Sequence, residues 1–312
     1  MKRIFPIHLF CLSGVALALG ACTSEVADGG NAPADGPVPI SFQTPETRAA
    51  KDGFDAGDAF SVWGWYADDA AGTNSRQVFD AEKVTNGGGN LWSYDGTQYW
   101  IAGKTYDFYA VYPTDVNAQV SRNGTITIKD FDASQTGADA VDLMTASATG
   151  MNGDSPQMVG LRFGHLLSRV NIMVQAEGSD AQISQARLSG IKTTGDYDSS
   201  NSSASWILDG TMSSFDLPSG GNYTATSVPS NLLGDMLVPP QPVSGFILSV
   251  DYSFAGTSAA TKEITLPADV VSQWEAGQSY TYTLTLSSNY ISFGIPVVNE
   301  WREASGGIII VD

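Results

Sequence analysis

The sequence is poor in the residues that most metal and catalytic sites need. It has two cysteines and two histidines in 312 residues, and 15 lysines and arginines against 33 acidic residues. Zinc is usually held by Cys and His side chains, so no zinc site is expected, and no cofactor is expected either. The formal net charge of −18 makes nucleic acid and anionic membranes poor partners, because both are themselves negatively charged.

Helical periodicity is also scarce, whereas the alternation typical of β-strands is common. In residues 105–112, Tyr106, Phe108 and Tyr112 share one face, which predicts a strand with an aromatic face on a core. Residues 279–287 alternate in the same way, with an inward face made of Tyr280, Tyr282, Leu284 and Leu286. Short strands separated by turn residues favour antiparallel sandwiches. We therefore predict an all-β chain with two tandem β-sandwich domains, at residues 38–155 and 156–312.

The N-terminus has the features of a bacterial lipoprotein signal. Lys2 and Arg3 precede an apolar run at residues 9–19, which is too short to span a bilayer. Leu19, Gly20, Ala21 and Cys22 then match the lipobox pattern. We expect residues 1–21 to be a signal peptide, Cys22 to be lipidated, and residues 22–37 to be a flexible tether. A plain secretory signal with an incidental cysteine is the alternative. Cys11 would leave with the signal peptide, so no disulfide is expected.

A short strand and a loop that proteases could reach follow the tether. Val38, Ile40 and Phe42 alternate with polar or proline positions, which predicts a first strand. Pro45 and small polar residues then predict an exposed loop, and this loop contains Arg48.

The residues that could support catalysis or bind calcium form weak patterns. His165 is the one histidine outside the signal peptide, and its apolar surroundings favour a structural residue bonded to nearby backbone over a catalytic one. The carboxylates of Asp52, Asp55 and Asp58, and those of Asp196 and Asp198, could touch calcium. Neither group has the spacing of a calcium loop, so solvated acidic loops are favoured. No carboxylate pair is singled out for glycosidase chemistry, and the chain is not predicted to be an enzyme.

Four tryptophans leave two interpretations open. Trp63, Trp65, Trp92 and Trp100 lie in or beside predicted strands. Buried, they would be ordinary core residues. Exposed together on one flat face, they would form a platform for sugar rings and favour a surface lipoprotein that binds glycans or host ligands.

The chain resembles the fimbrillin-like lipoproteins, which are shaft, tip and accessory subunits of the type V pili of Bacteroidales-type bacteria. The resemblance covers nearly all of the chain after the signal peptide. It is carried by the lipobox ending at Cys22, the loop at 47–49, and the segments 54–58, 91–94, 99–100, 106–113, 142–144, 161–170, 239–241 and 274–282.

The resemblance implies two transthyretin-like Greek-key sandwiches and a lipoprotein anchored in the outer membrane at the cell surface. It further implies that an arginine-directed protease cuts after Arg48, that the first strand with Val38, Ile40 and Phe42 is removed, and that a neighbouring subunit's C-terminal strand takes its place. In this sequence the candidate donor residues are Ile308, Ile309, Ile310 and Val311. The implied partners are other pilin subunits and a host or bacterial surface ligand. Only eleven residues follow Trp301, so shaft, tip and anchor roles all remain open.

Overall fold

The computed structural model describes residues 36–44, 54–88, 91–200, 205–218 and 223–301. The described residues from Pro37 to Trp301 form one compact unit. Within the described ranges the regular structure is β-sheet, apart from one short 3-10 helix, η1 (Gly137–Asp139). The predicted all-β fold is confirmed. No helix in this part of the chain is both long and apolar enough to cross a membrane.

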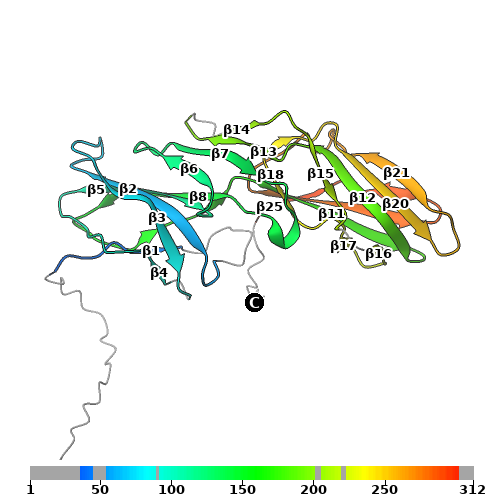
Figure 1. The fold of residues 1–312 in the computed structure, drawn as a ribbon, viewed down its shortest axis with the longest axis horizontal. Helices are drawn as coiled ribbons and strands as arrows, with labels where there is room; N and C mark the ends of the chain where they lie inside the picture. Colours follow the sequence, from blue (N-terminus) through cyan, green and yellow to red (C-terminus); the bar gives the residue numbers. More distant parts are fainter. Residues whose placement is uncertain (1–35, 45–53, 89–90, 201–204, 219–222, 302–312) are drawn as a thin grey trace, which may run out of the picture. The chain divides into compact units, whose positions relative to one another are not determined.

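An antiparallel sheet built around the most aromatic strand dominates the first half of the chain, and we call it the aromatic sheet. Its strand order is β10 (Gly164–His165), β8 (Met144–Asn152), β5 (Thr105–Tyr112), β2 (Ala59–Ala67), β3 (Arg76–Asn86) and β4 (Trp92–Ser93). Figure 1 shows β2, β3, β5 and β8 together. β8 pairs with β5 as far as Asn152, so residues 149–152 belong to the sheet, although their composition is typical of a linker.

A second sheet combines strands that are far apart in the sequence, and we call it the β7–β13 sheet. Its order is β14 (Ser205–Leu208), β13 (Thr194–Asp198), β7 (Ile126–Asp132) and β6 (Asn117–Val120). The antiparallel pairing of β7 with β13 joins residues on both sides of position 155.

The second half of the chain supplies two further sheets. One has the order β17 (Ser230–Asn231), β11 (Ser168–Glu177), β23 (Gln278–Ser287) and β24 (Ile291–Phe293), with β18 (Met236–Val238) on β11 and β25 (Val297–Glu300) on β23. The other has the order β15 (Ser213–Asp216), β12 (Ala181–Ile191), β20 (Ile247–Phe254) and β21 (Ala260–Thr265), with β16 (Tyr223–Ala225) on β12. β12, β20 and β21 lie side by side in Figure 1. β19 (Gln241–Pro242) and β22 (Gln273–Trp274) form a small separate pair.

The buried side chains fall into three clusters that match these layers. The two sheets of the second half enclose one cluster, in which Tyr280, Tyr282, Leu284 and Leu286 are all buried as predicted. The aromatic sheet has a cluster on each face. Phe60, Tyr106 and Phe108 belong to one, whereas Trp63, Tyr109 and Val111 belong to the other, together with Ile128 and Tyr197 of the β7–β13 sheet.

Burial on both faces explains why strand β2 is buried along almost its whole length. Tyr106 and Phe108 are buried as predicted, but Tyr112 is only half-buried. Tyr112 is the last residue of β5, and its ring packs at 5.2 Å from that of Phe54 at the edge of the core.

Candidate functional site

The first strand lies between two separate stretches of backbone. We use this name for residues 37–44, of which β1 (Phe42–Gln43) is the regular part. On one side the Ile40 amide donates to the Gln98 carbonyl at 2.8 Å, and the Trp100 amide donates to the Val38 carbonyl at 2.9 Å. On the other side β1 runs parallel to β9 (Val159–Gly160). We call residues 98–100 and 159–161 the two walls of the first-strand site.

The first strand contributes side chains to the cluster on the face of the aromatic sheet that carries Phe60, Tyr106 and Phe108, and we call this cluster the outer core. The cluster on the other face, with Trp63 and Tyr109, is the inner core. Ile40 is 2% exposed and Phe42 is 1% exposed, whereas Val38, at 36%, lies at the edge. The Phe42 ring packs against four others, with centroid distances of 6.2 Å to Phe60, 5.5 Å to Phe79, 5.9 Å to Tyr94 and 5.9 Å to Phe108. All four contacts are edge-to-face, a geometry that aromatic pairs prefer. An eight-residue segment therefore completes a core that later strands build.

Tyr94 contacts the first strand through both its ring and its hydroxyl. The hydroxyl donates to the Ile40 carbonyl at 2.8 Å and accepts from the Gln98 amide at 3.2 Å. Burial raises the pKa of Tyr94 above its ordinary value, which further favours the neutral hydroxyl that donates this bond. This side chain thus links the first strand to the wall at residues 98–100.

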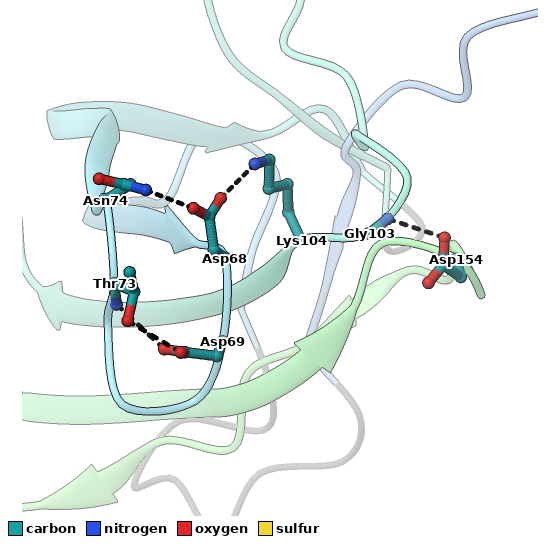
Figure 2. A network of polar contacts seen from close by, with 7 residues as sticks. All are labelled: Asp68, Asp69, Thr73, Asn74, Gly103, Lys104 and Asp154. Atoms are coloured by element: carbon teal, nitrogen blue, oxygen red, sulfur yellow. Dashed lines mark hydrogen bonds and ion pairs between the residues drawn. The ribbon is translucent and has the colours of Figure 1, made fainter.

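The two walls are also tied to each other without the first strand. Beyond each wall the chain turns, and the Gly103 amide donates to an Asp154 carboxylate oxygen at 2.8 Å (Figure 2). The Gly153 amide donates to the Lys104 carbonyl, also at 2.8 Å. These bonds join the turn after residues 98–100 to the turn before β9, so the walls are connected by contacts that do not involve residues 37–44.

An ion pair fixes the same turn to the aromatic sheet. The Lys104 ammonium contacts Asp68, which also accepts from the Asn74 side-chain amide at 2.6 Å (Figure 2). The hydrogen bond from Lys104 lowers the pKa of Asp68 below its ordinary value. Asp69 accepts from the Thr73 hydroxyl at 2.8 Å in the same loop. These contacts hold the loop between β2 and β3 against the turn that contains Lys104.

The four tryptophans do not form an exposed platform, so that interpretation is wrong. Trp63, Trp65 and Trp100 are buried, at 5%, 9% and 6% exposure. Trp92 is half-buried, and its ring lies 4.8 Å from that of Phe60. Trp63 and Trp65 belong to the inner core, and Trp92 and Trp100 belong to or pack on the outer core. All four are covered because both faces of the aromatic sheet carry a core.

His165 is buried, as expected of a structural residue. Its Nδ1 lies 3.1 Å from a carboxylate oxygen of Asp142, a side-chain partner that the sequence analysis did not name. Its ring stacks on Trp301 at 3.9 Å with an interplanar angle of 8°. Trp301 is 2% exposed and is the last described residue. The contact packs the end of the described chain against the strand pair β8–β10.

The acidic groups considered for calcium have other partners. Asp196 accepts from the Lys129 ammonium at 2.7 Å, and this hydrogen bond lowers the pKa of Asp196. Asp198 accepts from the Ser200 amide at 2.7 Å, and Asp58 accepts from the Asp55 amide at 2.7 Å. Among the described residues no group of three or more His, Cys, Asp and Glu side chains is placed to hold a metal ion.

Several predicted site residues lie outside the described residues, namely Cys22, Arg48, Asp52, Ile308, Ile309, Ile310 and Val311. The structure adds residues that the sequence analysis did not assign to the first-strand site, above all Tyr94, Val159 and Leu161. Val159, Leu161 and Phe163 are buried at alternate positions, and this period-2 pattern was the available signal. Nothing in the sequence indicates that Tyr94 reaches the Ile40 carbonyl, because that contact spans 54 positions.

The fold and the site define an all-β protein whose first strand fills a core between two walls formed by later residues. A family model described as fimbrillin-like matches residues 47–301, and the chain belongs to this family. A relative from Bacteroides uniformis, named as a candidate fimbrium subunit Fim1C, is 22% identical and aligns over 96% of each chain.

The fold of this chain is similar to that of several solved structures. A candidate cell adhesion protein from Bacteroides uniformis has a TM-score of 0.60 at 20% identity, covering 86% of this chain and 100% of its own. A fimbrial protein from Bacteroides vulgatus has a TM-score of 0.56 at 19% identity, covering 85% of this chain and 99% of its own.

Proposed function

We propose that the chain is a structural subunit of a cell-surface fimbrium and that it assembles with other subunits by exchange of its first strand. The observation that carries this proposal is the first-strand site itself. Ile40 and Phe42 are core residues, yet they belong to a short segment near the start of the described chain, held between two walls that are tied to each other. Membership of the fimbrillin-like family supports the same role.

Removal of the first strand would expose apolar pockets and unpaired backbone groups along both walls. Such an edge is costly in water, and a strand from another chain relieves the cost by forming the same backbone hydrogen bonds and filling the same pockets. Arg48 follows the first strand by a few residues, so a cut after it would separate the strand from the rest of the fold. The segment with Ile308, Ile309, Ile310 and Val311 is the candidate strand that this chain offers to a neighbour.

Treatment of the full chain with an arginine-specific protease tests this function. We expect a cut after Arg48 followed by growth of higher-order species in size-exclusion chromatography when donor subunits are present. Arg48→Ala blocks both events, whereas deletion of residues 306–312 leaves the cut intact and removes only the ability to donate. Unaltered assembly by the Arg48→Ala variant would contradict the proposal.

The lipobox supports export as a lipoprotein that is anchored in the outer membrane through Cys22. Stable anchoring needs more than one acyl chain, and a lipidated N-terminal cysteine provides them. We expect Cys22→Ala to move the protein from the membrane fraction to the soluble fraction. An unchanged membrane fraction would refute this anchor.

The alternative of a glycan-binding lipoprotein loses its main support, because Trp63, Trp65 and Trp100 are buried. No observation on the described residues favours it over assembly into a fimbrium.

A further inference from the structure

The first-strand site is most specific at the position of Phe42. Its side chain is 1% exposed and lies among Phe60, Phe79, Tyr94 and Phe108, all edge-to-face. Two residues earlier, Ile40 is 2% exposed in the same core. The site therefore presents an aliphatic position followed, after one intervening residue, by a position lined with aromatic rings.

We propose, building on the strand exchange described above, that this site selects a segment in which a branched aliphatic residue is followed two positions later by an aromatic one. The natural occupant is then such a segment on a different protein, and not the C-terminal tail of a second copy of this chain. The partner is identified by this pattern of side chains.

The tail after Trp301 does not carry this pattern, and Ile291 and Phe293, which do, lie in β24, which is already paired with β23. Ile308, Ile309, Ile310 and Val311 are all aliphatic, and residues 302–312 contain no aromatic residue, so no register of the tail places an aromatic ring at the Phe42 position. An aliphatic side chain there fills less space than a phenyl ring and forfeits the four ring contacts. A packed core relaxes only partially around a smaller side chain, so a cavity remains at the Phe42 position and binding of the tail is weaker.

Tyr94 also constrains the register of the incoming strand, because it contacts two positions of the strand at once. Because its hydroxyl accepts from the Gln98 amide, its own proton is directed to the Ile40 carbonyl, and its ring lies 5.9 Å from that of Phe42. A single side chain thus contacts both the carbonyl of the aliphatic residue and the aromatic residue two positions later. A strand shifted by one residue would turn its aromatic side chain to the opposite face. Tyr94 is therefore a residue that determines specificity.

The strand that this chain donates therefore differs from the strand that it receives. This chain can donate its aliphatic tail to a different subunit, but it receives a strand with an aromatic residue. Through residues 302–312, copies of this chain alone do not build a polymer, so the assembled species contains at least one further kind of subunit.

Peptide exchange on the nicked full chain tests the proposal. The chain is cut after Arg48, or at a sequence-specific protease site placed between residues 46 and 50, and three peptides then compete with the nicked-off strand. These are residues 37–44, the same peptide with Phe42→Leu, and residues 305–312. Binding is measured by native mass spectrometry and by fluorescence anisotropy of labelled peptides. The Tyr94→Phe protein, which keeps the ring and loses the hydroxyl, is the matched variant.

We expect the native 37–44 peptide to bind, the Phe42→Leu peptide to bind about 10-fold more weakly, and the tail peptide about 100-fold more weakly. The Tyr94→Phe protein binds the native peptide about 5-fold more weakly, as the loss of one hydrogen bond predicts. Equal binding of the tail and native peptides overturns the selectivity but leaves strand exchange standing. If no peptide enters, the native one included, strand exchange fails and the selectivity fails with it.

Discussion

At the scale of single residues, Phe42 links the sequence to the proposed function. The residue lies 12 positions before the next residue of the same packed group, Phe54, and the Phe42 ring contacts strands β2, β3 and β5 of the aromatic sheet. The alternation of Val38, Ile40 and Phe42 predicts which side chains point inward, and Ile40 and Phe42 are buried. The exposure of Val38 was not predictable, because it depends on where the neighbouring wall ends.

Phe42→Ala is expected to lower the free energy of unfolding of the uncut chain by about 3–5 kcal/mol, because it removes a buried ring and leaves a cavity. Val38→Ala, on the same strand but 36% exposed, should cost less than about 1 kcal/mol. Urea denaturation followed by tryptophan fluorescence measures both. Similar values for the two variants would mean that the first strand is not part of the cooperative core.

Tyr282 supplies a prediction about pH. Burial raises its pKa from 10.0 to about 12, and its oxygen accepts from Trp274 Nε1 at 3.1 Å. The folded state therefore favours the neutral phenol. This stabilisation is fully present below pH 10 and is lost as the pH rises from about 10 towards about 12, by an amount on the order of 3 kcal/mol.

Tyr282→Phe should flatten the loss of stability between pH 10 and pH 12, while costing about 1–3 kcal/mol at pH 7 because the Trp274 donor loses its acceptor. Tyr99→Phe, at a position that is 45% exposed, is the control for the cost at pH 7 and should change stability there by little. Denaturation curves at pH 8, 10 and 11 decide the matter. An unaltered slope in the Tyr282→Phe protein would show that this phenol does not titrate with unfolding.

At the scale of elements, the walls of the first-strand site depend on short turns instead of long strands. β9 has two residues, and residues 98–100 belong to no named strand and pair with the first strand through the isolated bridge between Pro39 and Tyr99. Long alternating strands such as β5 and β23 were predictable from their period of two. These short walls were not, because three or four residues carry too little pattern, and their positions depend on the contacts of Gly103 and Asp154.

Asp154→Ala removes the bond from the Gly103 amide and should loosen the wall at residues 98–100. We expect amide hydrogen exchange at Gly103 and Trp100 to accelerate about 5- to 10-fold, as the loss of about 1 kcal/mol predicts, while Val111 in the centre of the sheet is unaffected. Asp95→Ala, at an exposed position, serves as the control. Unchanged exchange at Trp100 would mean that the ties between the walls do not support the site.

At the scale of the whole molecule, the sequence predicts the fold class and the family better than the arrangement of the sheets. The β7–β13 pairing could not be predicted, because strand periodicity does not say which distant strand is the neighbour. The same pairing explains why Trp63 and Trp65 are buried, since the β7–β13 sheet contributes to the core that covers them. The division into domains at residue 155 and the roles of Cys22 and Arg48 stay predictions.

The central claim is that the first strand is absent from the assembled subunit and that another chain's strand occupies its site. The most direct measurement is mass spectrometry of this subunit in fimbriae purified from cells that express it, analysed for the N-terminal peptide. We expect a polypeptide that begins at Ala49, with no peptide from residues 37–44. Recovery of residues 37–44 in stoichiometric amounts, joined through Arg48 to the rest of the assembled subunit, would contradict it.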